Sequence, residues 1–224
     1  WMIDLQEEGT CKLRTDSPVF LREVRRFWTR LAEEIRPYLW KNGGPVIGIQ
    51  LENESRDSWA YYRVLKQLAV ELGFDVPLYT RTGWAEPEGR EPAFGETIPL
   101  YGGYAAGFWD RTLEAMPADY LSAFKMSPKR TSDEIATDHF GVRTTEDGDS
   151  AGQYPYFTCE LGGGMASSYH RRLRMEPEDA FALTVVKLGS GSNLPGYYVY
   201  HGGTNPTDCG VSMGESQRDR YTAC

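Results

Sequence analysis

Residues Gly43–Glu54 predict the fold of this chain, with the sequence GGPVIGIQLENE. A Gly-Gly-Pro turn signal precedes a short apolar run, and the run ends in Glu-Asn-Glu. Because buried parallel strands are near-continuous runs of Val, Ile and Leu, we expect such a strand over 46–51. A carboxylate beside a buried strand is costly unless it is paired or functional. The segment therefore directs attention to Glu54.

A second run of the same kind ends in Glu160. It covers Tyr154–Glu160, with the sequence YPYFTCE, and glycines follow it. In α/β folds ligands bind at the carboxyl ends of parallel strands. Glu54 and Glu160 can therefore form a carboxylate pair, which is the apparatus of glycoside hydrolysis. On spacing alone, the alternative that each glutamate is a surface residue just past a strand stays open.

Three helices are predicted from the spacing of apolar residues and from their start signals. The first begins at Ser17-Pro18, the second covers roughly 58–72, and the third opens at Glu176. The side chains expected to face inward are Phe20, Val24, Phe27, Leu31 and Ile35 in the first helix, Tyr62, Leu65, Leu68, Ala69 and Leu72 in the second, and Phe181, Val185 and Leu188 in the third.

Strand candidates alternate with these helices, and each ends in polar or glycine-rich residues. They cover 46–51, 76–80, 97–101, 154–160 and 196–200. Alternating β and α elements predict a parallel sheet and an α/β fold class. Five strands are too few to close an eight-stranded barrel. We therefore expect residues 1–224 to form one domain that is part of a (β/α)8 TIM barrel.

Composition excludes several classes of function. The chain has 24 Lys and Arg against 32 Asp and Glu, and this acidic balance argues against nucleic-acid binding. No apolar run is long enough to predict a membrane span. The four cysteines form no CxxC pair, and His139 and His170 lack partners at metal-ligand spacing. Dinucleotide and P-loop motifs are missing, so no metal or cofactor is expected.

Three motifs resemble glycoside hydrolase family 35, the retaining β-galactosidases, whose catalytic domain is a (β/α)8 barrel. Gly43–Glu54 is similar to the fourth-strand segment of the family, Thr158–Gly164 to the seventh-strand segment and Tyr198–Asn205 to the eighth-strand signature. The resemblance covers nearly the whole chain. It implies that strands four to eight are present and that strands one to three and the C-terminal β domains belong to a longer parent protein.

The resemblance also implies roles for individual residues. Glu160 falls at the position of the nucleophile and Glu54 at that of the acid/base, and Asn53 resembles the residue that binds the sugar 2-hydroxyl. Glu52 is expected to form a salt bridge with a basic residue. Four further residues are expected near the cleft, with core packing or a turn as the alternative for some of them: Trp84, Tyr104, His201 and Asn205.

Two departures from the family pattern leave the sugar open. Leu161-Gly162 follows the expected nucleophile where the family has an aromatic residue, and Ser55-Arg56 follows Glu54 where the family has Tyr-Gly. The expected partner is a carbohydrate substrate. The alternatives are a related glycosidase with another sugar preference, a catalytically silent carbohydrate-binding homologue and a scaffold fragment.

The sequence gives weaker indications of source and location. Asn53-Glu54-Ser55 is a glycosylation sequon inside the expected site, so either the source does not glycosylate it or the position is buried, and we favour a bacterial source. We expect a secreted or periplasmic parent protein. An open half-barrel leaves an unpaired strand edge, so the isolated chain is expected to be poorly stable and inactive.

Overall fold

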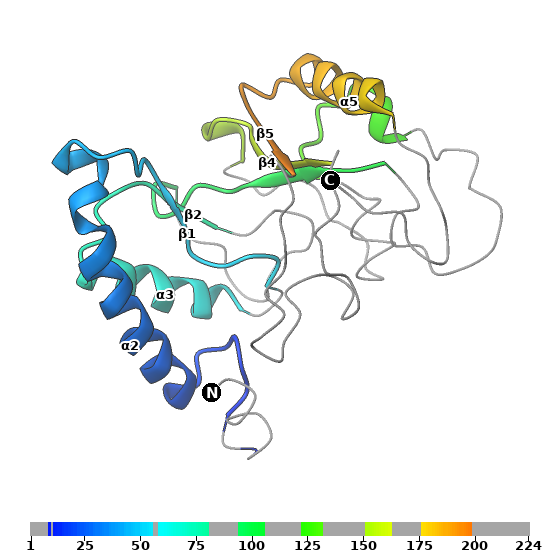
Figure 1. Cartoon of the computed structure of the whole chain (residues 1–224). Helices are drawn as coiled ribbons and strands as arrows, with labels where there is room; N and C mark the ends of the chain where they lie inside the picture. Colours follow the sequence, from blue (N-terminus) through cyan, green and yellow to red (C-terminus); the bar gives the residue numbers. More distant parts are fainter. Residues whose placement is uncertain are drawn as a thin grey trace, which may run out of the picture. The chain divides into compact units, whose positions relative to one another are not determined.

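The computed structural model describes residues 9, 11–55, 58–80, 94–105, 122–131, 151–162 and 176–198. The chain divides into two compact units, one formed by Trp1–Leu100 with Gly148–Tyr154 and the other by Tyr101–Asp147 with Pro155–Cys224. Figure 1 shows the helices and strands of both units. Among the described residues, no helix is long and apolar enough to cross a membrane.

The described elements are helices, short 3-10 helices and strands in alternation. The first unit contains α2 (Pro18–Ile35), η1 (Arg36–Tyr38), η2 (Trp40–Asn42), β1 (Ile49–Gln50), α3 (Trp59–Glu71), β2 (Leu78–Tyr79) and η4 (Ala151–Gln153). The second unit contains β3 (Tyr101–Gly103), η3 (Ser122–Phe124), β4 (Phe157–Gly162), α5 (Pro177–Gly189) and β5 (Leu194–Tyr198).

Every described strand pair is parallel, which confirms the prediction from alternating elements. β1 pairs with β2 in the first unit, and the second unit has the strand order β3-β4-β5. The register places Gly102 of β3 opposite Glu160 of β4. Within each unit the described strands that follow one another along the chain are therefore neighbours in the sheet, which is the common arrangement when strands and helices alternate.

Helix α2 confirms the prediction for the first helix, with one error on its buried face. Pro18 occupies the first turn, where a missing N–H does no harm. Phe27 is 59% exposed, although it was predicted to face inward. Trp28 faces the core instead, because it lies one helical turn after Val24. Its ring packs edge-on against that of Phe74, with 5.8 Å between the ring centroids.

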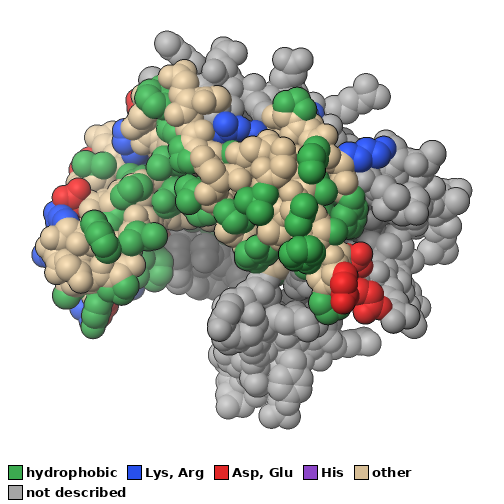
Figure 2. Space-filling view, turned by 90° about the horizontal axis from the view of Figure 1, so that it is seen from above, with side chains coloured by type: hydrophobic (Ala, Val, Ile, Leu, Met, Phe, Trp, Pro, Cys, Tyr) green, Lys and Arg blue, Asp and Glu red, His purple; other side chains and the backbone are tan. Residues whose placement is uncertain are grey.

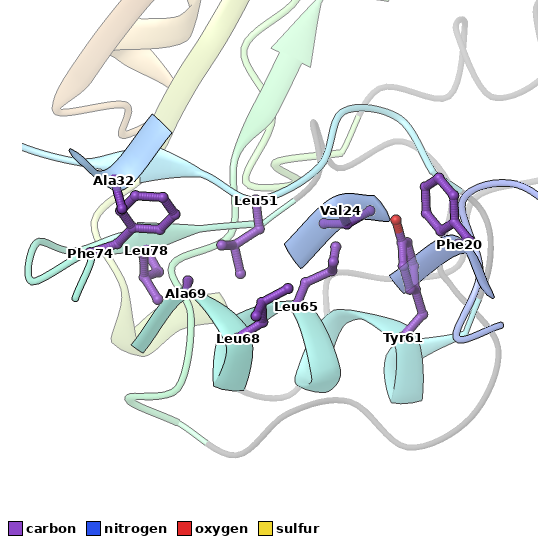
Figure 3. Close-up of a cluster of buried hydrophobic side chains, with 10 residues drawn as sticks. All are labelled: Phe20, Val24, Ala32, Leu51, Tyr61, Leu65, Leu68, Ala69, Phe74 and Leu78. Carbon is purple, nitrogen blue, oxygen red and sulfur yellow. The ribbon is translucent and has the colours of Figure 1, made fainter. Parts of the chain in front are cut away.

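Helix α3 begins and ends as its sequence predicts. The Ser58 hydroxyl accepts a hydrogen bond from the Tyr61 N–H at 3.3 Å, and Gly73 follows the helix with a left-handed φ of 84°. Both helices contribute to one hydrophobic core (Figure 3), formed by Phe20, Val24, Ala32, Leu51, Tyr61, Leu65, Leu68, Ala69, Phe74 and Leu78.

This core fixes the strand that leads to Glu54. Leu51 is 5% exposed and packs in the core immediately after β1. Full burial of one leucine side chain contributes about 1.5–3 kcal/mol. The Leu51 N–H also donates to the Tyr79 carbonyl at 3.0 Å. The chain is therefore anchored three residues before Glu54.

Helix α5 begins with a capping box, in which Glu176 and Asp179 each bond the other's backbone N–H. Its predicted inward face is wrong. Phe181, Val185 and Leu188 are 71%, 43% and 49% exposed, whereas Leu183 is fully buried. Figure 2 shows hydrophobic side chains on the molecular surface.

The helix carries apolar residues on more than one side, so spacing alone does not select the inward face. Gly103 of β3 explains which face packs: a Cβ there would lie 2.8 Å from Cε of Lys187. Lys187 therefore lies directly against the sheet. Leu183, one turn earlier on the same side, enters the core with it.

Candidate active site

The loop after β1 carries two of the predicted site residues, Asn53 and Glu54. Glu54 adopts a left-handed backbone with φ 54°. This region is unfavourable for a residue with a Cβ, by about 1–2 kcal/mol. The loop is fastened on its far side, because the Tyr62 hydroxyl on α3 donates to the Ser55 carbonyl at 3.1 Å. Glu54 is thus held in a sharp turn with anchored residues on both sides.

Polar groups around Asn53 form a connected network. The Nε2 of Gln50 donates to the Glu52 carbonyl at 2.8 Å and to the Asn53 Oδ1 at 2.9 Å. The Asn53 N–H donates to Oε2 of Glu52 at 3.2 Å. Side-chain and backbone groups of Asn53 are therefore bonded at the same time, which restricts its amide to one orientation.

Arg14 joins this network from far along the sequence. Its Nε lies 2.5 Å from Oε1 of Glu52, and its Nη2 donates to the Asn53 carbonyl. The ion pair confirms that Glu52 pairs with a basic residue. Burial lowers the pKa of Arg14, but the hydrogen bond and the charge of Glu52 outweigh it and raise that pKa overall. The guanidinium therefore stays cationic beside the loop.

Glu160 lies in the second unit, inside β4. The strand continues to Gly162, so the prediction that it ends at Glu160 is short by two residues. The hydroxyl of Tyr104 donates to Oε2 of Glu160 at 2.7 Å. Partial burial raises the pKa of Glu160, and the hydrogen bond from Tyr104 acts in the opposite direction and lowers it.

Tyr104 is buried, which bears on its two interpretations. Only 2% of the residue is exposed, which favours core packing over stacking on a sugar face. The ring rests on the backbone of Gly162, where a Cβ would lie 2.1 Å from Cδ1 of Tyr104. A side chain at position 162 would displace the ring. The glycine therefore allows Tyr104 to reach Glu160.

Tyr104→Phe is expected to shift the pH dependence of any reaction that needs ionised Glu160. The change removes a donor that favours the carboxylate, so the pKa of Glu160 rises further and its ionisation requires a higher pH. The acidic limb of the kcat/KM profile should move toward higher pH. Tyr197→Phe is the matched control, since that exposed tyrosine lies on β5 of the same unit. An unmoved acidic limb contradicts the assignment.

The structure describes four of the seven predicted site residues, in two pairs. Asn53 and Glu54 lie in the first unit, and Tyr104 and Glu160 lie in the second. The predictions for three residues lie outside the described residues: Trp84, His201 and Asn205. The part of the chain that the structure describes contains no group of His, Cys, Asp and Glu side chains that could hold a metal ion.

Sequence reasoning missed the residues that support these side chains. Arg14 lies just before the first helix, in a segment to which the sequence motifs gave no role. Gln50 alternates with Glu52 along the strand, which is a weak signal for a shared face. No local pattern indicated the contact between Gly162 and Tyr104.

Comparison with known proteins gives the family. The model of glycosyl hydrolases family 35 matches residues 1–221. The chain belongs to this family. Membership confirms the resemblance to the family and implies a TIM barrel, with which the small parallel sheets of the structure are consistent.

Several curated relatives of this chain are named β-galactosidases. β-Galactosidase 17 of Arabidopsis thaliana is 28% identical over 198 residues, which cover 87% of this chain and 24% of that protein. The Xanthomonas manihotis β-galactosidase is 29% identical over 115 residues, 49% of this chain and 19% of that protein. The bovine β-galactosidase is 38% identical over 84 residues, 35% of this chain and 13% of that protein. The chain thus spans about a quarter of these relatives' length or less.

Proposed function

We propose that the full-length protein is a retaining glycoside hydrolase that removes terminal β-galactosyl residues from oligo- or polysaccharides. Membership in family 35 and the names of the relatives support this proposal. The observation that carries it is the Glu160 carboxyl group in β4, partly buried and bonded through Oε2 to the Tyr104 hydroxyl at 2.7 Å. A carboxylate held in this way has a fixed direction of attack.

Glu160 is the proposed nucleophile. Its carboxylate attacks the anomeric carbon while the bond from that carbon to the leaving oxygen breaks. Protonated Glu54 gives its proton to the leaving oxygen, which departs as an alcohol. The sugar is then joined to Glu160 as an ester. The Tyr104 hydroxyl stabilises the negative charge of Glu160 before attack and again when the ester breaks.

Glu54 takes the opposite role in the second half of the reaction. As a carboxylate it removes a proton from water, and the resulting oxygen attacks the anomeric carbon and displaces Glu160. Two inversions at one carbon leave the product with the starting configuration. Glu54 is then protonated and Glu160 ionised, so the enzyme is ready for another substrate.

The remaining proposed contacts bind the sugar. Asn53 hydrogen-bonds the 2-hydroxyl group, a contact that strengthens in the transition state. Trp84, His201 and Asn205 are proposed to contact the substrate at the ends of their strands. The chain would supply barrel strands four to eight, with β1 as the fourth strand and β5 as the eighth.

The configuration of the first product tests the retaining mechanism. The full-length protein is incubated with an aryl β-galactoside, and the anomeric protons are followed by NMR. β-Galactose should appear first and mutarotate afterwards, whereas α-galactose as the first product contradicts retention. Faster turnover of another aryl glycoside would identify a different sugar, and binding of galactosides with no turnover of any glycoside would indicate a silent homologue.

A further inference from the structure

Backbone strain marks two residues that lie close together in the fold although they are distant in sequence. Among the described residues, Arg14 and Glu54 are the non-glycine residues with positive φ, at 55° and 54°. Such conformations persist only where the surrounding structure over-determines them, and they cluster at functional sites. The guanidinium of Arg14 contacts the two residues that precede Glu54. The two strained residues therefore belong to one assembly.

Arg14 acts on this assembly as a two-point clamp. One nitrogen bonds the Glu52 carboxylate and a second bonds the Asn53 carbonyl, so the planar guanidinium sets the distance between a side chain and a backbone group. A lysine ammonium is a point charge without this fork. The left-handed backbone at Arg14 changes the direction of the chain at the residue from which this side chain extends.

Gln50 fixes the other side of Asn53. Its Nε2 has two hydrogens, and they are directed to the Glu52 carbonyl and to Oδ1 of Asn53. Because Oδ1 accepts from Gln50, the amide is oriented with Nδ2 as the group that remains to meet a ligand. Asn53 is exposed, so a ligand can reach this amide.

We propose that Arg14 and Gln50 are positioning residues that present the Nδ2 of Asn53, as a hydrogen-bond donor, to a hydroxyl group of the sugar. The inference rests on the proposed function and adds to it the direction of the hydrogen bond and the residues that set it. The sugar hydroxyl acts as the acceptor. Neither Arg14 nor Gln50 needs to touch the substrate.

The test compares two substrates in the full-length protein, an aryl β-galactoside and its 2-deoxy analogue. The kcat/KM of the galactoside divided by that of the 2-deoxy analogue measures how much the 2-hydroxyl group contributes to the reaction. The difference in intrinsic reactivity between the two sugars is the same for every variant, so it cancels when variants are compared. Gln50→Glu keeps the size but replaces the donor by an acceptor, which repels Oδ1 of Asn53. The ratio is expected to fall about tenfold, as for the loss of one hydrogen bond.

Matched variants separate positioning from general damage. Gln50→Lys restores a donor and should recover part of the ratio, whereas Gln67→Glu makes the same charge change at an exposed position of α3 and should leave the ratio unaltered. Arg14→Lys should lower the ratio about three- to tenfold. Arg25→Lys is its control, since Arg25 pairs with Glu71 in an exposed ion pair of the same unit.

A double-mutant cycle and a crystal structure complete the test. In an Asn53→Ala background, Gln50→Glu should have no further effect on the ratio. Equal losses on both substrates in Gln50→Glu, with the ratio unchanged, overturn the proposal. If the unmodified protein turns over neither substrate, the proposed function fails. The inference is then decided by neutron crystal structures, which distinguish the amide oxygen from the nitrogen, because an Asn53 amide that keeps its orientation in Gln50→Glu also overturns it.

Discussion

Glu160→Ala is expected to lower kcat on aryl β-galactosides by at least about 10⁴-fold, since the variant has no nucleophile to form the ester. Added azide should restore part of the turnover, because the truncated side chain leaves room for a small anion on the same face of the sugar. The product should then be the α-galactosyl azide, with inverted configuration. The measurement is the release of an activated phenol with and without azide, together with NMR of the product.

The same substitution should leave the fold intact, which separates lost chemistry from lost structure. The pKa of Glu160 is raised in the folded protein, mainly by burial, so the native state binds more protons than the unfolded state above the ordinary glutamate pKa. Stability therefore falls as the pH rises through the raised pKa, and the ionised side chain weakens the fold at neutral pH. Removal of the carboxyl group also takes one acceptor from the buried Tyr104 hydroxyl, and because the two effects oppose each other the thermal midpoint at that pH should change little.

Two outcomes would contradict the assignment of Glu160. Turnover that persists in Glu160→Ala without azide assigns the nucleophile to another residue. A loss of turnover that azide does not reverse, together with a lower thermal midpoint, would mean that Glu160 stabilises the fold and is not the nucleophile. Glu178→Ala is the control, because this exposed glutamate lies in the first turn of α5 in the same unit.

Elements with two agreeing local signals could be predicted from the sequence. Helices α2 and α3 combine an apolar stripe with a proline or serine at the start, and the structure places them where these signals lie. The face of α5 could not be predicted, because Phe181 and Leu183 are both apolar and lie on different sides of the helix. The choice between them depends on the shape of the sheet, in which Gly103 admits Lys187.

The candidate site also contains residues that could be predicted from the sequence and residues that could not. Glu54 and Glu160 could be predicted as chemical groups, since each follows or ends an apolar run in which a carboxylate is unusual. Their supporting residues depend on contacts between distant segments. Arg14 reaches Glu52 across 38 residues and Tyr104 reaches Glu160 across 56, and no periodicity within one element encodes either distance.

Glu54→Ala is expected to separate substrates by their leaving groups. For a methyl or phenyl β-galactoside, which needs a proton on the departing oxygen, kcat/KM should fall about 10²–10⁴-fold. For a dinitrophenyl β-galactoside the fall in kcat/KM should be much smaller, because that leaving group departs as a stable anion. Azide should accelerate release of the sugar from Glu160 and give the β-galactosyl azide, the opposite anomer to that from Glu160→Ala. An equal fall for all leaving groups contradicts the acid role of Glu54.

Glu54→Gly extends this experiment to the strained backbone. Alanine keeps the Cβ and therefore the unfavourable left-handed conformation, whereas glycine adopts φ 54° without that penalty. If the loop keeps its shape, Glu54→Gly should be at least as stable as Glu54→Ala in thermal unfolding, although glycine also gains entropy in the unfolded chain. Both variants should lose the acid equally. Glu33→Ala on α2 is the control, as an exposed glutamate of the same unit. A glycine variant with equal chemistry and greater stability would show that the fold accepts strain at Glu54 to place its carboxyl group.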